Sequence, residues 1–344
     1  MKKKIIQAVK FVVFLAIGVA LLYYAAKGID PKEVWENVKT AKYSWIILSL
    51  VIAFISHLSR AQRWRLLMEP LGHKPSLKNT FYAVMIGYMA NYAFPRIGEV
   101  TRCGILNRSD KIPFDSLFGT VIVERATDLL FSMMFLVVLL VSKFSFFGNF
   151  FGEHVFRPIG DKLSVLFQNK LVIYILIGFF IVLIAGIFLM RSRLRENPIV
   201  KKMKAILKGV GSGLSSVYKM RRRWGYVLHS FIVWICYLMS SFVIFYAFTF
   251  TSHLNLFDAV FILVAGSFGF IAPVQGGVGA FHFIVSRALM MYGIAETDAF
   301  SFATIQHGTQ SLLAILLGAI SFGLIYKALK INKVATKVNG DEAT

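Results

Sequence analysis

Long apolar runs separated by short basic segments are the dominant pattern along the chain. Several runs reach or approach the ~20 residues that a helix needs to cross ~30 Å of hydrocarbon. A soluble fold would leave these runs exposed to water, so the pattern predicts a polytopic helical membrane protein. The clearest runs are Val9–Ala26, Trp45–Leu58, Thr127–Val141, Leu171–Met190, Tyr226–Phe250 and Ser311–Tyr326.

Two further apolar segments, Phe81–Phe94 and Val260–Ala272, are shorter, about 20 Å each as helices. Each ends at a proline within a Gly-containing turn, AFPRIGEV at 93–100 and IAPVQGGVG at 271–279. If both crossed the membrane fully, the basic segment Arg191–Trp224 would lie outside, against the positive-inside rule. We therefore predict two re-entrant helical hairpins and six full spans.

The charge distribution indicates cytoplasmic loops. The formal net charge is +21, hydrophobic residues make up 57% of the chain, and the mean hydropathy is +0.67. Lysines and arginines lie between the apolar runs, which is typical of cytoplasmic loops and not of a nucleic-acid-binding face. Lys2–Lys4, the loop with Arg60, Arg63 and Arg65, and the C-terminal tail should all face the cytoplasm. The expected location is the plasma membrane, with both termini inside and Val9–Ala26 as an uncleaved span.

A repeated order of elements predicts a single transmembrane domain, residues 1–344, made of two inverted repeats. In each repeat a span leads to a Pro/Gly-broken hairpin and then to a long helix. Such paired interrupted segments indicate a transport site near the bilayer midplane. The first unit is 45–142, the second, inverted unit is 226–326, the basic cytoplasmic loop is 191–225, and the tail is 327–344.

Ionisable residues cluster around the first break and in the helix that follows it. A charge inside the membrane costs ~2.5–3.5 kcal/mol, so these side chains should face inward and pair. Arg125 and Asp128 are i,i+3 neighbours, and the remaining negative charge would be neutralised by Arg96 or Arg102. The cluster is either a site for an anionic headgroup or a structural ion-pair network. Its members are Arg96, Glu99, Arg102, Glu124, Arg125 and Asp128.

The second break carries polar but uncharged residues. A helix restarting after Pro273 would direct its N-terminus at the break, and helix N-termini bind phosphate and carboxylate groups. The alternative is a plain structural kink. His307 either takes up a proton or is an ordinary buried histidine. The candidate site residues here are Gln275, Gly276, Gly277 and His307, with His282, Gln306 and Gln310 in broadly corresponding places.

Sequence signatures of ordinary catalysis are missing. The chain has no G-x-x-x-x-G-K-[ST] phosphate loop, no HExxH and no G-x-S-x-G. Cys103 and Cys236 have no metal-like spacing. We therefore expect no enzyme activity, no cofactor and no metal.

Three motifs together resemble the flippase-like transmembrane family, which includes the membrane half of lysylphosphatidylglycerol synthase. They are PRIGEVTR from Pro95, ERATDLL from Glu124, and APVQGGVGAFH from Ala272. The resemblance covers roughly residues 8–330 and implies a bundle that moves anionic or aminoacylated phospholipid, or a related lipid, between leaflets. In the synthase an aminoacyl-transferase domain follows the bundle, whereas this chain ends at Thr344, so it should not make aminoacyl lipid itself. The family's polar motifs match Pro95, Arg96, Gly98, Glu99, Arg102, Glu124, Arg125, Asp128, Pro273, Gly276 and Gly277.

The resulting hypothesis is a lipid flippase or scramblase whose substrate is an anionic or aminoacylated phospholipid or a polyprenyl phosphate. A second hypothesis is a non-transporting membrane partner of a glycosyltransferase or another lipid-modifying enzyme. A third is a membrane-embedded enzyme acting on a polyprenyl phosphate. Transport measured in liposomes separates the first from the other two.

Overall fold

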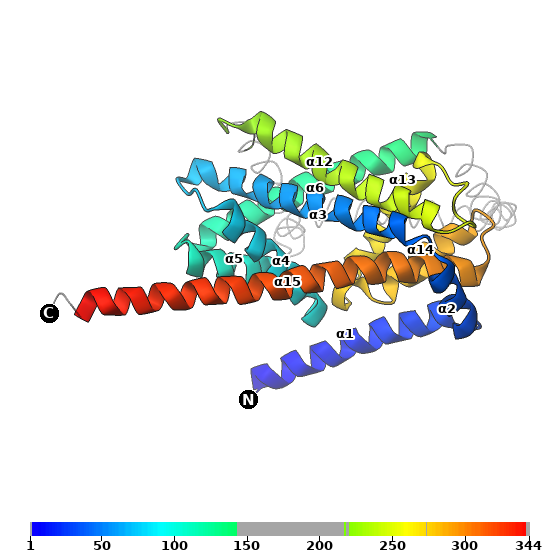
Figure 1. Ribbon diagram of the computed structural model, residues 1–344, viewed down its shortest axis with the longest axis horizontal. Coiled ribbons are helices and arrows are strands. Elements are labelled where there is room, and N and C mark those ends of the chain that lie inside the picture. The colour runs from blue at the N-terminus through cyan, green and yellow to red at the C-terminus, as the bar shows by residue number, and fades with distance from the viewer. Residues whose placement is uncertain (1, 143–216, 218–219, 273, 342–344) are drawn as a thin grey trace, which may run out of the picture. The chain divides into compact units, whose positions relative to one another are not determined.

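The computed structural model describes residues 2–142, 217, 220–272 and 274–341, and every regular element among them is a helix (Figure 1). The chain divides into two units, Met1–Ser132 with Val217–Thr344, and Met133–Ser216. The site lies in the first unit. The helices are α1 Lys2–Ala26, α2 Pro31–Thr40, α3 Tyr43–Met68, η1 Glu69–Leu71, α4 Leu77–Ala93, α5 Gly98–Ser109, α6 Phe114–Ser142, α12 Arg223–Val243, η3 Ile244–Ala247, α13 Leu256–Ile271, η4 Gln275–Gly277, α14 Ala280–Met290 and α15 Glu296–Asp341.

Four helical stretches among the described residues are long and apolar enough to cross a membrane. A fifth is gained if α1 and α2, bent by 84° at a short break, count as one. The chain is an all-α membrane protein, as predicted. The count of six spans stays a prediction, because Leu171–Met190 and most of Arg191–Trp224 lie outside the described residues. The four stretches are Tyr43–Leu71, Phe114–Ser142, Arg223–Ala247 and Glu296–Lys330.

Capping residues fix where several helices begin. Asp30 precedes Pro31 and accepts from the Lys32 N–H at the start of α2. Ser76 accepts from the backbone N–H of Asn79 at the start of α4. A capping box of an Asn and an Asp side chain opens α13. Each cap satisfies backbone donors that have no partner inside the helix.

α4 and α5 form the first hairpin. The chain reverses at Pro95, and Gly98 at the start of α5 packs directly on Gly87 of α4. At the open base, the Asn79 side chain donates to Asp110 at 3.1 Å. The two helices have 17 and 12 residues, so they extend about 25 and about 18 Å, less than a bilayer crossing. The predicted reversal is confirmed.

α13 and α14 form the second hairpin. Gly269 of α13 lies against the backbone of Phe281 in α14. At the open base, the Phe261 and Tyr292 ring centroids are 5.9 Å apart. The reversal between the helices is confirmed, whereas Pro273, its predicted cause, lies outside the described residues.

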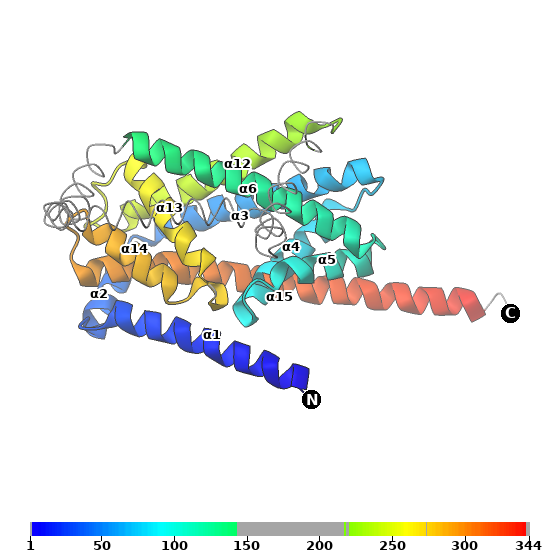
Figure 2. The same cartoon turned by 180° about the vertical axis from the view of Figure 1, so that it is seen from behind.

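The tips of the two hairpins meet beside α1 and α15. The ring of Tyr92, in the last turn of α4, lies against Gly276 of the second tip. Its hydroxyl donates to Ser311 of α15 at 2.9 Å. Phe94, just past α4, has its ring centroid 5.3 Å from that of Phe11 in α1. Because the tips touch while the open bases lie apart, the hairpins enter the bundle from opposite ends (Figure 2).

α3 and α12 pack side by side in opposite directions. Ser49 Oγ lies 2.8 Å from Ser240 Oγ near one end, and Ser59 Oγ lies 2.8 Å from His229 Nδ1 near the other. Small hydroxyl residues let membrane helices approach closely and bond across the interface. These helices open two halves with the same order of elements: the first half runs from α3 to α6, and the second half from α12 to α15.

α3 continues well beyond its predicted end. The apolar run predicts a span over Trp45–Leu58, followed by a cytoplasmic loop with Arg60, Arg63 and Arg65. That loop is wrong, because the helix continues without interruption to Met68. The segment contains no Gly or Pro to end it. Two arginines assigned to a loop are therefore buried inside the bundle.

Candidate functional site

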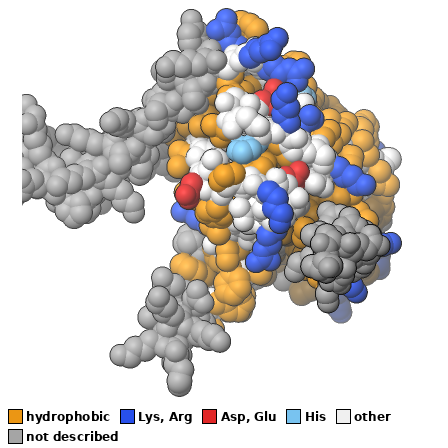
Figure 3. Space-filling view, turned by 90° about the vertical axis from the view of Figure 1, so that its left-hand side faces the viewer, with side chains coloured by type: hydrophobic (Ala, Val, Ile, Leu, Met, Phe, Trp, Pro, Cys, Tyr) orange, Lys and Arg blue, Asp and Glu red, His pale blue; other side chains and the backbone are white. Residues whose placement is uncertain are grey.

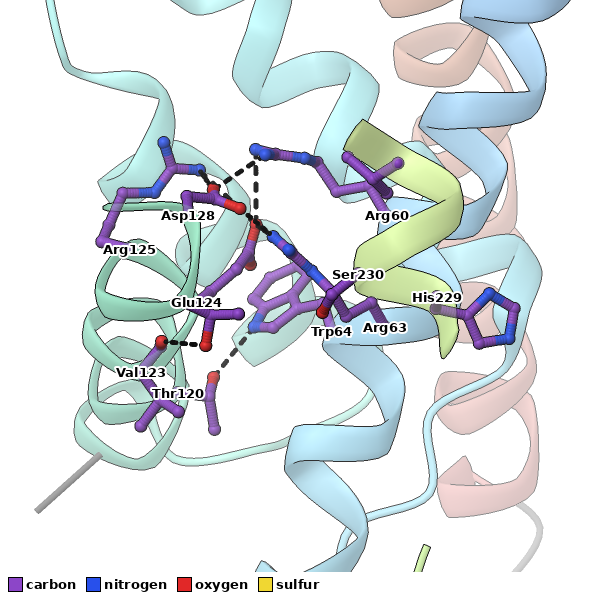
Figure 4. A network of polar contacts seen from close by, with 12 residues as sticks. Arg60, Arg63, Trp64, Thr120, Val123, Glu124, Arg125, Asp128, His229 and Ser230 are labelled. Atoms are coloured by element: carbon purple, nitrogen blue, oxygen red, sulfur yellow. Dashed lines mark hydrogen bonds and ion pairs between the residues drawn. The ribbon is translucent and has the colours of Figure 1, made fainter. Parts of the chain in front are cut away.

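Two arginines of α3 direct their guanidinium groups toward α6. Arg60 and Arg63 are three residues apart and share one face of the helix (Figure 4). Arg60 Nη2 lies 2.8 Å from Asp128 Oδ2, and Arg63 Nη2 lies 2.8 Å from Asp128 Oδ1. Asp128 is thus held between two cations. The sequence pattern did not identify either arginine, since both fell past the apolar run.

Glu124, one turn before Asp128 on α6, has a fully buried side chain and is the centre of the site. Its Oε1 lies 3.1 Å from Arg63 Nη2 and 3.4 Å from Arg60 Nη1. Its Oε2 lies 2.9 Å from Arg102 Nη1 of α5. Of the two arginines predicted to neutralise this charge, Arg96 and Arg102, the contact with Arg102 is confirmed. The prediction that one negative charge would remain is wrong, because Arg60 and Arg63, which were not predicted to lie here, add two positive charges.

Arg125 forms the exposed edge of the site, with 45% of its side chain accessible. Its Nη2 lies 3.6 Å from Asp128 Oδ2, which confirms the predicted i,i+3 pair. Its Nη1 lies 3.8 Å from Glu99 Oε1 in the first turn of α5. Arg125 thereby links α6 to the returning helix of the first hairpin.

The turn before α5 is strained. Arg96 has a φ of 61°, in the left-handed region that residues with a side chain rarely adopt. The N–H of Gly98, the first residue of α5, donates to the Asn91 side chain at 2.7 Å. One donor of the predicted helix-terminus anion site is therefore already used. Strained turns of this kind concentrate at functional sites.

Aromatic rings surround the guanidinium groups. The Arg102 guanidinium carbon lies 4.5 Å from the centroid of the Trp64 ring. The indole Nε1 of Trp64 donates to Thr120 Oγ1 at 2.8 Å, which fixes the ring. Arginines stacked on rings are held in place and partly shielded from lipid. Tyr88, Tyr226 and Tyr237 lie about the other two guanidiniums, each with its ring centroid 6.0 Å away.

We call these ion-paired residues the charged cluster. Its four arginines and three carboxylates leave one positive charge. Four buried guanidinium nitrogens of Arg60, Arg63 and Arg102 have no hydrogen-bond acceptor among the described residues, and the Tyr88 hydroxyl also lacks a partner there. An anion rich in oxygen would match both the charge and the donors. The charged cluster comprises Arg60, Arg63, Glu99, Arg102, Glu124, Arg125 and Asp128.

The second half holds amide and hydroxyl groups in a comparable place. Gln306 Nε2 donates to Ser241 Oγ at 3.3 Å, and Gln310 Nε2 donates to Ser240 Oγ at 2.9 Å. These bonds join α15 to α12, as the ion pairs join α6 to α3. They do so without any formal charge.

The predicted residues around the second break do come together. His307 Nε2 lies 2.9 Å from the carbonyl oxygen of Gly276, and its ring centroid is 4.9 Å from that of His282. Gln275 donates through Nε2 to a backbone carbonyl of α1 at 3.2 Å. Gly277 lies close to a phenylalanine ring of α13. The break is therefore tied to α1 and α15 by polar contacts.

The sequence is similar to a described protein family and to several known membrane proteins. The family described as lysylphosphatidylglycerol synthase TM region matches residues 9–318. A UPF0104 membrane protein of Methanothermobacter thermautotrophicus is 23% identical over 92% of each chain. Another, of Methanocaldococcus jannaschii, is 21% identical over 96% of this chain and 97% of its own. No solved structure matches.

One similar protein carries a more specific name. Glycosyltransferase AglD of Haloferax volcanii is 29% identical over 130 residues. The match covers 38% of this chain and 21% of AglD.

Proposed function

The chain belongs to the family of lysylphosphatidylglycerol synthase transmembrane regions, and from this premise we propose that it moves an anionic lipid between the leaflets of the membrane. The candidate substrates are an anionic phospholipid, its aminoacylated form and a polyprenyl phosphate. The observation that carries the proposal is the charged cluster, which has a buried centre at Glu124, one excess positive charge and unsatisfied buried donors.

A phosphate headgroup fits this chemistry. Charge is what makes the unassisted crossing of a lipid slow, since each charge in hydrocarbon costs several kcal/mol. Guanidinium groups bind phosphate oxygens through paired, charge-assisted hydrogen bonds. Arg125 is the accessible member, so a headgroup would meet it first and then reach Arg60, Arg63 and Arg102. The acyl or isoprenyl tails would stay in lipid throughout.

The arrangement of the hairpins supports alternating access. We propose that α3 to α6 and α12 to α15 are inverted repeats and that both hairpins are re-entrant. Their tips touch at Tyr92 and Gly276, so a shift of one tip changes the contacts of the other. The proposed substrate-binding set is Arg60, Arg63, Arg96, Glu99, Arg102, Glu124, Arg125 and Asp128 in the first half and Gln275, Gly276, Gly277 and His307 in the second.

Transport in liposomes tests the proposal. Without ATP, the purified protein should accelerate the movement of fluorescent phosphatidylglycerol, lysyl-phosphatidylglycerol or polyprenyl phosphate between leaflets. Arg125→Gln should slow it by about tenfold or more, because a hydrogen bond to a charged group contributes about 1.5–3 kcal/mol. Arg287→Gln is the matched control, since Arg287 pairs with Glu296 on the surface at 3.0 Å, away from the cluster. Its rate should stay at the wild-type level.

Two outcomes would contradict the proposal. The first is no acceleration for any of the three lipids. The second is equal transport by the wild type and by both Arg125→Gln and Arg102→Gln in protein that remains folded. The second result would leave the charged cluster as a structural ion-pair network.

The two hairpin bases should face opposite sides of the membrane. Exposed basic residues gather at the end where α3 ends and α6 begins (Figure 3). By the positive-inside rule, we propose that this end and both termini face the cytoplasm. The exposed basic residues at this end include Lys74, Lys78, Arg108, Lys111 and Arg221–Arg223.

Cysteine labelling tests this orientation. In a Cys236→Ser background, Lys111→Cys should be shielded from an impermeant maleimide in intact cells, whereas Ser252→Cys should react. The native Cys103 does not interfere, because its side chain is fully buried and the reagent cannot reach it. Labelling of both positions from outside would reject opposite entry of the hairpins.

The second candidate function is a membrane partner of a glycosyltransferase, and the similarity to AglD favours it specifically. A partner would bind the lipid-linked substrate and present it to an enzyme without moving it. Sugar transfer to lipid, measured in isolated membranes with and without this chain, would then fall in its absence. This function becomes the leading one if liposomes show no lipid movement.

A further inference from the structure

α6 and α15 carry matching residues at the same helical position. Glu124 and Gln306 each lie ten residues after the first residue of their helix. From these points the sequences read ERATD at 124–128 and QHGTQ at 306–310, with a threonine at the fourth place in both. In this register Arg125 of the first half corresponds to His307 of the second.

The contacts of these two residues correspond as well. Arg125 reaches Glu99, the residue that follows Gly98 at the tip of the first hairpin. His307 reaches the carbonyl oxygen of Gly276 at the tip of the second hairpin. Gly98 and Gly276 both lie three residues after the proline of their break. Each side chain therefore connects a long helix to the tip of its own hairpin.

The two side chains differ in charge. A guanidinium is permanently cationic, whereas an imidazole changes its charge between about pH 5 and pH 8. His307 is buried with an exposed fraction of 4%. It has aromatic neighbours on α13 and α14 and, in η4, the carbonyl that accepts its hydrogen bond.

Few other titratable groups face His307. On α14 there is His282, whose Nδ1 is buried without a partner among the described residues. Tyr92 of α4 lies against Gly276, whose carbonyl His307 contacts, and its hydroxyl is already bonded to Ser311. No ion pair within the described part of the chain involves either histidine. A proton on this pair would therefore add a charge that no carboxylate in the described ranges neutralises.

We propose that His307, when protonated, supplies in the second half the positive charge that Arg125 supplies permanently in the first. An anionic headgroup can then bind in the second half only when His307 carries the additional proton. Neutral His307 donates through Nε2 to Gly276, so the added proton goes to Nδ1 and this hydrogen bond is kept. This inference rests on the proposed lipid transport and extends it to proton dependence.

The energetics favour joint binding of a proton and an anion. A lone cation buried beside a second imidazole is costly, and so is a lone phosphate in a neutral pocket. Together the two neutralise each other. By linkage, the anion promotes protonation to the same extent that protonation promotes anion binding.

Transport at symmetric pH values tests the inference. Between about pH 8 and about pH 6, wild-type transport of labelled phosphatidylglycerol should rise by up to about tenfold per pH unit. His307→Arg should transport at a rate that does not change with pH. His307→Gln, which keeps a donor for the Gly276 carbonyl, should be slow and insensitive to pH. His253→Gln, at an exposed loop position, should keep the wild-type profile.

Each alternative outcome has a definite meaning. A wild type whose transport does not change with pH would overturn the inference and leave the transport function intact. A wild-type profile in His307→Gln would do the same. A wild type inactive toward every anionic lipid at every pH would instead contradict the proposed function.

Direct titration keeps the inference testable in that last case. Nitrogen NMR of histidine-labelled protein in detergent reports the charge of His307, assigned by comparison with His307→Gln. We expect His307 to become charged at a higher pH when phosphatidylglycerol is present than when it is absent, because the proton and the anion bind jointly. A ring that stays neutral throughout, with and without the lipid, would overturn the inference.

Discussion

The two halves of the bundle use the same order of elements but fill their interior differently. In the first half, α6 is joined to α3 and α5 by ion pairs centred on Glu124 and Asp128. In the second half, α15 is joined to α12 by the amides of Gln306 and Gln310. The second half shows that neutral groups suffice to connect these helices. Packing alone therefore does not account for the charges of the first half.

The physical cost of the charged cluster strengthens this point. Replacing a buried ion pair with neutral groups of similar size is often harmless or stabilising, because desolvation of the ions offsets their attraction. The first half nevertheless holds three arginines, Arg60, Arg63 and Arg102, in the interior. A role in binding an anion explains their retention better than a role in stability.

The largest expected effect distinguishes Glu124 from its counterpart Gln306. Glu124→Ala removes the carboxylate that four arginines contact and leaves buried cations without an anion. The free energy of unfolding should fall by about 3–5 kcal/mol. Gln306→Ala removes one hydrogen bond and should cost about 1 kcal/mol for that bond. Equilibrium unfolding in mixed micelles measures both values.

Similar losses in the two variants would show that the halves are energetically alike. The charged cluster would then be no more than a stronger version of the amide contacts. Glu124→Gln is the conservative companion, since it keeps the shape and removes only the charge. Its loss should lie close to that of Glu124→Ala.

The hairpin tips offer a second comparison. A side chain at Gly276, where φ is 57°, would collide with the ring of Tyr92, whereas one at Gly98 would collide with the backbone carbonyl of Gly87. Gly276→Ala and Gly98→Ala should each destabilise the protein by about 1–3 kcal/mol. Adding Tyr92→Ala should restore part of the loss only for Gly276→Ala, because a ring can be removed and a backbone carbonyl cannot.

Gly104 provides the control for these substitutions. It lies in α5, where the Cβ of an alanine would have no neighbouring atom within 4 Å. Gly104→Ala should stabilise the protein by about 0.5–1 kcal/mol through the better helix propensity of Ala. If Gly104→Ala destabilised the protein as much as Gly98→Ala, the loss at Gly98 could not be attributed to close packing at the hairpin tip.

Much of the fold was predictable because its signals are local. Both chain reversals followed from short apolar segments that end at a Pro/Gly break. The pairing of Arg102 with Glu124 and of Arg125 with Asp128 followed from charge balance and helical spacing. These inferences need only the lengths of the apolar segments, the periodicity of a helix and the free-energy cost of a charge in lipid.

The arginines of α3 were not predicted, although a signal was present. Arg60 and Arg63 lie at i,i+3 in a stretch without Gly or Pro, so the helix had no reason to stop at Leu58. The positive-inside rule favoured a loop, and it misled because these charges are neutralised by α6. The meeting of Tyr92 with Gly276 could not be predicted from one sequence, since the two residues come from different halves.

The smallest expected effect concerns the threonine that both halves share. Thr127 and Thr309 each donate to the carbonyl four residues earlier, but only Thr127 also accepts from the Tyr226 hydroxyl, at 2.7 Å. Thr127→Val leaves that buried hydroxyl without its acceptor and should cost about 1–2 kcal/mol. Thr309→Val leaves no donor among the described residues without its acceptor, so the free energy of unfolding should change by less than about 0.5 kcal/mol. Unfolding in mixed micelles, with Tyr226→Phe added to Thr127→Val, resolves the cause: the second substitution should recover much of the loss if the unsatisfied hydroxyl is responsible. An equal cost for both threonines would mean that the polar contact between α6 of the first half and α12 of the second half does not stabilise the bundle.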